Sequence, residues 1–460
     1  SDIYSFALNQ SAGGRIANAR NVDVELNSDD ADMESSIEGS IQASGTVTLK
    51  GGFGDQITDA FLQHFAADTL SFVSDNIQIN EALRPGSITT LAFEDTDGGP
   101  VIGVAPGEIV APQIHWTGQA GGSAGDCQVT EDFLQYFQAL TFTFTSDNIL
   151  LTENVAVGLG AASGIDIATL VLEDTNGGPT TTVGVTIEAP AVILSGDVGD
   201  SVATELISHF KTDTLTFDSD SLLLNTVGVM VDPDRIGQLV LHDDDEGPTI
   251  GPAIGANDIA ITASNLVFSS DSGQQIDEGN LISHEFLGHF TADTVTFTSG
   301  DHGLAINQGI DGELTIGRIV FDDADGVQVD GHFWAPTTVE FQSPGGGLNS
   351  NGYTLSAPQL QVTVGDDVDI ITEEMDGNLD ICVLSANGGV TIDNTGRLTV
   401  KNLFAVSESG ISAGSGAISI SAAGPVIVEA DVKAAGGQDI LIAAAGDLDT
   451  DMLTVSADIT

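Results

Sequence analysis

The chain has 460 residues and a formal net charge of −58, because 68 Asp and Glu residues are set against only 10 Lys and Arg. So few basic side chains argue against nucleic acid as a partner, since phosphates are bound through Lys and Arg, and the carboxylates disfavour an anionic membrane surface. No run of about 18 apolar residues is present, so no membrane-spanning segment is predicted. The hydrophobic share of 41% is sufficient for a folded core.

The first 55 residues are predicted to form an N-terminal β segment, residues 1–55. Val22, Val24 and Leu26 alternate with polar residues, which is the period-2 pattern of a half-buried strand. No charged and apolar leader of the secretory kind stands at Ser1, so either a leader has been removed, or export uses another route, or the protein is intracellular.

Four related blocks follow, predicted at residues 56–128, 129–200, 201–280 and 281–354. Each opens on an apolar cluster with helical spacing and continues into a run in which apolar residues alternate with Ser and Thr, as in a strand. The last Phe of the opening cluster recurs at spacings of 72, 73 and 80 residues: Phe65, Phe137, Phe210 and Phe290. Each block should therefore hold a short helix followed by several short strands.

Strand-like pieces within the blocks recur every 20 to 27 residues, roughly the length of one solenoid coil. The sequence therefore predicts a mostly β fold, a parallel β-solenoid in which equivalent residues stack along the core. The series expected inside that core is Phe72, Phe144, Phe217 and Phe297. The alternative is a string of small β-sandwich domains, which is disfavoured because each block has only four or five convincing strands and no linker separates the blocks.

The carboxy-terminal segment, residues 355–460, lacks the helix-containing block and is expected to continue as a regular β-helix. Residues 417–424 are echoed 22 residues later by residues 439–446, with short apolar runs between them. This texture resembles the repeat region of filamentous-haemagglutinin-type adhesins. The resemblance implies right-handed parallel β-helical coils of a bacterial surface protein, and it covers only this segment.

An acidic turn recurs in every block and is the best candidate for a metal site. Its spacing is an oxygen ligand, any residue, a second oxygen ligand, and then Gly in all four cases. Ca²⁺ prefers hard oxygen ligands on a flexible loop, and Gly permits a sharp turn. The predicted calcium ligands are Asp95, Asp97, Asp174, Asn176, Asp244, Glu246, Asp323 and Asp325. The alternative is a turn in which the Asp or Asn side chain bonds its own backbone ahead of Gly.

Motifs for catalysis are weak, so no enzyme activity is predicted. His284 and His289 are one residue too far apart for the zinc-protease helix, which needs two His at i and i+4. Ser123 and Ser412 each lie in a Gly-x-Ser-x-Gly match without the strand-turn-helix context of a nucleophile. A polysaccharide-degrading β-helix enzyme is the enzyme alternative, although 2 Trp and 3 Tyr leave few residues for sugar stacking. The two cysteines, 255 residues apart, are expected to be separate buried thiols.

The sequence predicts an exported, acidic structural protein that forms a surface filament, sheath or layer by self-assembly. Its carboxylates need counterions in a compact state, which fits stabilisation by Ca²⁺ or the high salt of a halophilic setting. The strand-like stretch at residues 453–459 has no polar cap, so pairing between copies is expected. The alternative is an adhesin that binds a glycan or a cell surface. Either role implies an extracellular or cell-surface location.

Overall fold

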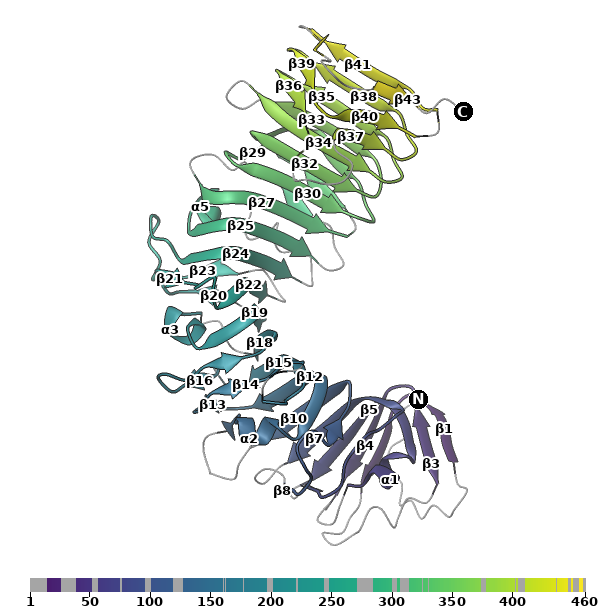
Figure 1. The fold of residues 1–460 in the computed structure, drawn as a ribbon, viewed down its shortest axis with the longest axis vertical. Coiled ribbons are helices and arrows are strands. Elements are labelled where there is room, and N and C mark those ends of the chain that lie inside the picture. The colour runs from purple at the N-terminus through teal and green to yellow at the C-terminus, as the bar shows by residue number, and fades with distance from the viewer. Residues whose placement is uncertain are drawn as a thin grey trace. The chain divides into compact units, whose positions relative to one another are not determined.

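The computed structural model describes most of the chain, and Figure 1 draws its strands as arrows. The described residues are 15–25, 39–51, 57–74, 77–95, 101–118, 127–159, 161, 163–176, 178–196, 202–220, 222–243, 248–270, 284–299, 304–306, 314–324, 326–329, 331–373, 378–401, 403, 410–435, 437–445, 448–449 and 455–457.

The protein is mostly β and folds as a parallel β-solenoid of about 15 turns with very little helix. The largest sheet has 28 strands, and its neighbouring strands come from successive turns of the chain. The predicted solenoid is therefore confirmed. The β-sandwich alternative is wrong, because the strands pair in parallel, each with the coil before it and the coil after it.

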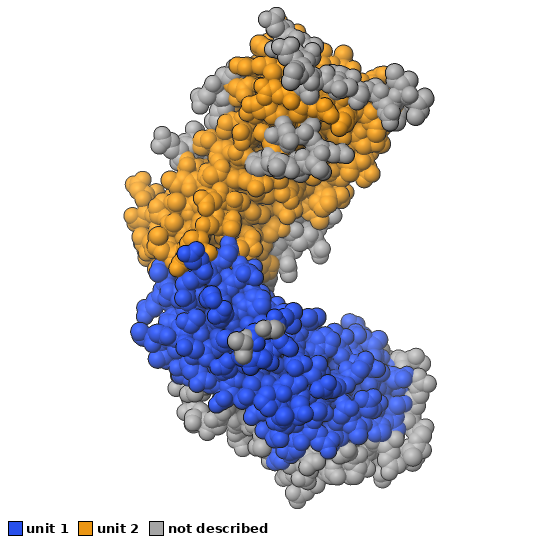
Figure 2. Space-filling view, viewed as in Figure 1, with its two compact units in different colours: residues 1–218, 234–237 blue, residues 219–233, 238–460 orange. Residues whose placement is uncertain are grey.

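Two compact units divide the chain, and they are coloured separately in Figure 2. Unit 1 consists of residues 1–218 and 234–237, and unit 2 of residues 219–233 and 238–460. The two units are defined by compactness, whereas the four predicted blocks are defined by repetition in the sequence. The division into units therefore does not test the block boundaries, which stay a prediction.

The strands of unit 1 are β1 (Arg15–Ala19), β2 (Val22–Glu25), β3 (Ser40–Ala43), β4 (Thr46–Lys50), β5 (Phe65–Ser74), β6 (Gln78–Ile79), β7 (Ile88–Asp95), β8 (Val101–Ile102), β9 (Ile109–Val110), β10 (Gln113–Gly118), β11 (Cys127–Gln128), β12 (Phe137–Ser146), β13 (Ile149–Leu151), β14 (Val155–Ala156), β15 (Ile167–Asp174), β16 (Thr180–Thr181), β17 (Ile187–Glu188), β18 (Ala191–Gly196) and β19 (Phe210–Ser219), the last residue of which belongs to unit 2.

In unit 2 the main sheet contains β22 (Ile236–Asp243, from its third residue), β24 (Ile261–Ser270), β25 (Phe290–Ser299), β27 (Thr315–Asp323), β30 (Thr338–Ser343), β32 (Gln359–Val364), β34 (Leu379–Ser385), β36 (Leu398–Val400), β37 (Gly410–Ala413), β39 (Val426–Val428), β40 (Asp431–Ala434), β42 (Leu448–Asp449) and β43 (Val455–Ala457), together with β21 (Val229–Met230). A second sheet contains β26 (Leu304–Ile306), β28 (Val327–Val329), β29 (Phe333–Trp334), β31 (Leu348–Ser356), β33 (Val368–Glu373), β35 (Val390–Asn394), β38 (Ile418–Ala422) and β41 (Ile440–Ala444), and a short pair is formed by β20 (Leu223–Leu224) and β23 (Thr249–Ile250).

The long sequence repeat corresponds to three turns of the solenoid. In unit 1 the main-sheet strands that carry the stacked core residues are β5, β7 and β10 in the first block and β12, β15 and β18 in the second. Phe72 pairs with Phe93, Phe93 with Trp116, and Trp116 with Phe144 of the next block. Equivalent residues of successive blocks are therefore three strands apart, roughly 14 Å at the usual strand spacing.

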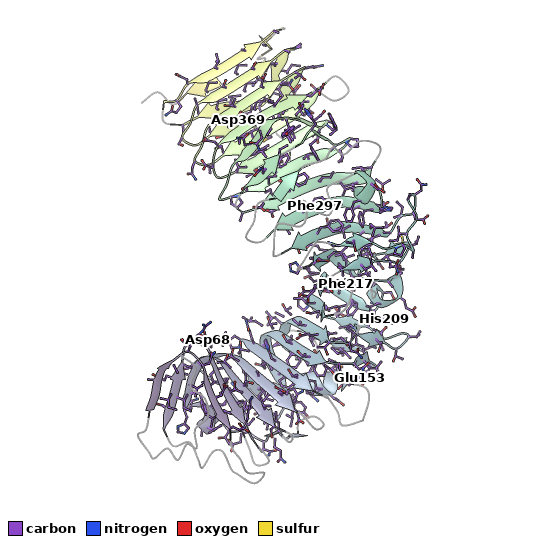
Figure 3. The ribbon with its side chains drawn as sticks, turned by 180° about the vertical axis from the view of Figure 1, so that it is seen from behind. Asp68, Glu153, His209, Phe217, Phe297 and Asp369 are labelled. Atoms are coloured by element: carbon purple, nitrogen blue, oxygen red, sulfur yellow. The ribbon has the colours of Figure 1, made fainter. Side chains whose placement is uncertain are left out.

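An aromatic column fills the core of each unit. In unit 1, Phe72 stacks on Phe93 at 5.7 Å between ring centroids, and Phe93 stacks on Trp116 at 5.3 Å. The four Phe residues predicted for the core are all fully buried, and Figure 3 labels Phe217 and Phe297. The predicted stacking of like residues is thus confirmed within each unit, with other apolar residues between the four.

One-turn helices interrupt the coils at the start of each block, as the sequence predicts. They are α1 (Asp59–Leu62), α2 (Glu131–Leu134), α3 (Thr204–Ile207) and α5 (His284–Leu287). Thr58 caps the first, since its hydroxyl accepts the amide hydrogen of Phe61 over 3.1 Å. Thr130 caps the second in the same way through Phe133. Because each helix is followed at once by the first strand of its block, it serves as a corner of the coil.

The carboxy-terminal coils continue the parallel β-solenoid with regular pairing between successive coils. Ile418 pairs with Ile440 and Ile420 with Ile442, which makes the 22-residue echo in the sequence one full coil. Cys382 is a buried free thiol in this region, as expected, and the side chain of Cys127 lies outside the described residues.

Candidate functional site

Each acidic turn begins with an aspartate buried at the end of a main-sheet strand. These residues end β7, β15, β22 and β27, and each is only 1–3% exposed: Asp95, Asp174, Asp243 and Asp323. In the third block the buried residue is Asp243, one position before the predicted ligand Asp244. In the first block the buried Asp95 stands two residues after the core residue Phe93. The same count from the core residue Leu241 identifies Asp243.

Three of these carboxylates, those of Asp95, Asp174 and Asp243, accept hydrogen bonds from backbone amides of the coil before their own. The amide of Ile149 donates to Asp174 Oδ2 over 2.7 Å, and the amide of Leu222 donates to Asp243 Oδ2 over 2.6 Å. Asp95 receives the amide of Ile77 over 3.2 Å. A buried carboxylate satisfied by backbone amides fixes the sharp corner between two coils.

Two of the four buried aspartates, Asp174 and Asp323, also close local turns. Asp174 Oδ1 accepts the amide hydrogen of Asn176 over 3.1 Å, and Asp323 Oδ1 accepts that of Gly326 over 3.3 Å. This is the turn considered above as the alternative to a metal site. Asp174 therefore bridges its own turn and the preceding coil with its two oxygens.

Glycine stands beside two of these aspartates in the following coil. Gly118 pairs with Asp95 and Gly196 with Asp174, at φ values of +124° and +102°. A Cβ at either position would lie 2.3 Å from the aspartate carbonyl oxygen, so only glycine fits.

Calcium binding at the acidic turns stays a prediction. Four of the eight predicted ligands lie in the described part of the chain: Asp95, Asp174, Asn176 and Asp323. The other four lie outside it: Asp97, Asp244, Glu246 and Asp325. Across the described ranges, no group of three or more His, Cys, Asp or Glu is placed to hold a metal ion.

Replacing Asp174 by Asn should destabilise unit 1 by about 1–3 kcal/mol in calcium-free buffer, because the NH₂ group of Asn cannot accept a hydrogen bond and either Ile149 or Asn176 would lose its acceptor. Asp147→Asn is the matched control, since Asp147 is exposed in the same block and should change stability by less than about 0.5 kcal/mol. Urea unfolding of both variants measures the difference. Equal stability of the two variants would contradict the bridging role.

The repeated histidines tie the helix ends to the preceding coil. The Nδ1 atoms of His64, His209 and His289 lie 2.6, 2.7 and 2.9 Å from the carbonyl oxygens of the coil before. Because a carbonyl only accepts, Nδ1 carries the proton in this arrangement. His209 is labelled in Figure 3, and its Nδ1 faces the carbonyl of Val185. The histidine series thus has a structural role in the coil corner.

Arg318 looks isolated in the sequence but belongs to a buried polar cluster. Its guanidinium forms an ion pair with Glu340, which is 3% exposed on the face of β30 opposite the core column. Glu340 Oε1 also accepts from Gln342 Nε2 over 2.7 Å and from Gln361 Nε2 over 3.0 Å. Burial lowers the pKa of the Arg318 guanidinium from its ordinary value, because desolvation disfavours the charged form. The cluster joins three successive strands of the main sheet.

Unit 1 carries an apolar hollow of about 490 Å³ on its surface. Leu140 and Leu159 line it and are 60% and 68% exposed. Pro85 and Pro112 contribute further apolar surface, and the lining includes two charged residues, Arg84 and Asp166, among others. Exposed leucines that meet in a hollow are a mark of an interaction surface.

One of the two serine candidates, Ser412, lies in the described part of the chain. Ser412 lies within β37, paired with Leu384 and Lys433 of neighbouring strands, instead of in a strand-to-helix turn. Ser123 lies outside the described residues. Among the described helices, none has the length and apolar character needed to cross a membrane.

Searches against protein families, curated proteins and solved structures found no match for the chain.

Proposed function

We propose that this protein is an exported, acidic structural solenoid whose copies associate into a filament, sheath or layer at a cell surface. The observation that carries this proposal is the apolar hollow of unit 1 around Leu140. The resemblance of the carboxy-terminal coils to filamentous-haemagglutinin-type adhesins supports the surface location.

Leu140 occupies a position that is acidic in the other three blocks. It is the fourth residue of β12, and the corresponding residues of β5, β19 and β25 are all exposed: Asp68, Asp213 and Asp293. Figure 3 labels Asp68. The backbone amide at this position bonds the preceding coil in three of the blocks, with donors Asp68, Leu140 and Asp213 at 3.0, 2.9 and 3.1 Å. The conformation is thus shared, and only the side chain differs.

An apolar position of this kind is where two copies of an acidic protein can meet. At a net charge of −58, carboxylates brought face to face repel each other. A contact centred on Leu140 avoids such pairs and removes apolar surface from water, at about 25 cal/mol for each Å² buried. Added salt or divalent cations screen the remaining charges, so association should rise with ionic strength. Ca²⁺ at the acidic turns would act in the same direction.

Replacing Leu140 by Asp should keep the protein folded and abolish association. The variant reproduces the residue found in the equivalent coils, so circular dichroism should be unchanged. Light scattering over a range of NaCl and CaCl₂ concentrations should show assembly of the wild-type protein and monomer for the variant. Negative-stain images at matched ionic strength, with and without chelator, show whether the assemblies are filaments or layers.

Two matched variants complete the experiment. Asp213→Leu places a leucine at the equivalent position of the third block, the fourth residue of β19, and should increase association. Leu441→Ala removes a leucine that is 61% exposed in unit 2 and should leave assembly unchanged. Wild-type protein that stays monomeric at every salt concentration, or an L140D variant that assembles as well as wild type, would refute the proposal.

A further inference from the structure

A polar groove of about 490 Å³ lies on the second sheet of unit 2, apart from the hollow of unit 1. This volume is within the range of small-ligand sites. The side chains that line it carry amides and carboxylates: Gln328, Asn349, Asn351, Asp366, Asp367 and Asp369. The three aspartates are exposed, and Figure 3 labels Asp369. The groove therefore offers many hydrogen-bonding groups in a small space.

The register of the strands sets the spacing of these groups. Gln328 of β28 pairs with Asn349 of β31, and Asn349 pairs with Asp369 of β33. Side chains in successive parallel strands are about 4.8 Å apart. Three polar side chains thus form a row across the groove. Such a row suits a ligand with hydroxyl groups repeated along its length.

An irregular segment of β31 forms one side of the groove. The pairing with β33 jumps between Asn349 and Thr354, so the residues between them leave the regular ladder. Asn351 has a φ of +49° and is the one non-glycine residue with positive φ in the described part of the chain. Its amide donates to Asn349 Oδ1 over 2.7 Å. Backbone bulges and left-handed residues of this kind concentrate at binding sites.

An exposed aromatic cluster adjoins this bulge. Tyr353 is two residues from Asn351, so their Cα atoms are at most about 7 Å apart. The ring of His332 stacks on that of Trp334 at 5.7 Å and meets Tyr353 edge-on at 5.6 Å. Trp334 and Tyr353 are both 37% exposed, whereas the other Trp of the chain, Trp116, is fully buried. An aromatic platform next to a polar groove offers one apolar and one hydrogen-bonding surface to the same ligand.

We propose that this groove and its aromatic platform bind a neutral polysaccharide. The apolar face of a sugar ring would stack on Trp334 and Tyr353, and the hydroxyls of the next rings would bond Asn349 and Asp369. Anionic sugars are rejected, because three aspartates and no Lys or Arg line the groove. This inference does not depend on the association of copies through Leu140, since the site lies within unit 2.

Tryptophan fluorescence of the full chain tests the site directly. Trp334 is the accessible Trp and the buried Trp116 is an internal reference, so a sugar that covers Trp334 should change its emission and protect it from acrylamide quenching. The probes are cellohexaose, maltohexaose and mannohexaose, with hexagalacturonate as the anionic comparison. We expect at least one neutral hexasaccharide to bind at millimolar concentration and hexagalacturonate not to bind.

Calorimetric titration of variants assigns the contacts. Trp334→Ala and Tyr353→Ala should each weaken binding about tenfold or more, which corresponds to 1.4 kcal/mol. Trp334→Phe should keep most of the affinity, because a ring remains, and Asp369→Asn tests the polar row. Leu140→Asp is the control that should bind sugar as the wild type does, even if it no longer associates. Failure of all three neutral hexasaccharides to bind, or unchanged affinity in both alanine variants, would overturn the inference.

Discussion

Replacing Phe297 by Ala is expected to lower the stability of unit 2 by about 3–5 kcal/mol, the usual loss for a large aromatic residue in a core. Phe297 is fully buried and stacks between Phe268 and Phe321, at 5.5 and 5.6 Å between ring centroids. The cavity would open in the middle of the aromatic column. Because each coil contacts only its neighbours, the coils on both sides should also lose support.

Hydrogen exchange of backbone amides shows how far the loss extends. Protection should fall in β25 and in its neighbours β24 and β27, and urea unfolding should give the total change. Phe297→Leu is the matched control and should cost less, because Leu241 already occupies this column beside Phe268. Loss of protection limited to residues 290–299 would show that the coils do not support one another.

The periodicity of the sequence was sufficient to predict the solenoid and the aromatic residues in its core. Stacked coils place their buried apolar residues at similar intervals along the chain, and these intervals can be read from the sequence alone. The 72–80-residue repeat does not itself give the length of one coil, since it contains three coils of unequal length. Phe72 and Phe144 consequently lie in one column but are separated by Phe93 and Trp116.

Positions on the corners and outer faces could not be predicted in the same way. Calcium binding at the acidic turn stays a prediction, whereas the bond from a backbone amide of the previous coil to a buried aspartate such as Asp174 is revealed by no local pattern. The ion pair of Arg318 could not be predicted because its partner, Glu340, is 22 residues away in the sequence, one coil later. Trp334 and Tyr353 likewise contact the same ring, that of His332, because β29 and β31 pair with each other. Each of these contacts depends on the register between neighbouring coils, and that register changes with the length of the segments that connect the strands.

The buried Arg318–Glu340 pair should contribute far more to stability than a surface pair. Glu340→Ala would remove the buried carboxylate that pairs with the half-buried guanidinium of Arg318, and with it the acceptor of Gln342 and Gln361. Breaking such a pair typically costs about 3–5 kcal/mol. The comparison is Lys211–Glu188 in unit 1, where the atoms are 2.7 Å apart but both side chains are about half exposed. Glu188→Ala should cost only about 0–1 kcal/mol.

A double replacement distinguishes the interaction between the two residues from the effect of removing one charge. Changing both Arg318 and Glu340 to Leu removes both charges together, so the double variant should be more stable than Glu340→Ala alone. Urea unfolding of the wild type, Arg318→Leu, Glu340→Leu and the double variant gives the coupling energy. Raising the salt concentration should weaken the exposed Lys211–Glu188 pair and leave the buried pair nearly unchanged. If Glu340→Ala costs no more than Glu188→Ala, Glu340 is not the acceptor that joins β27, β30 and β32.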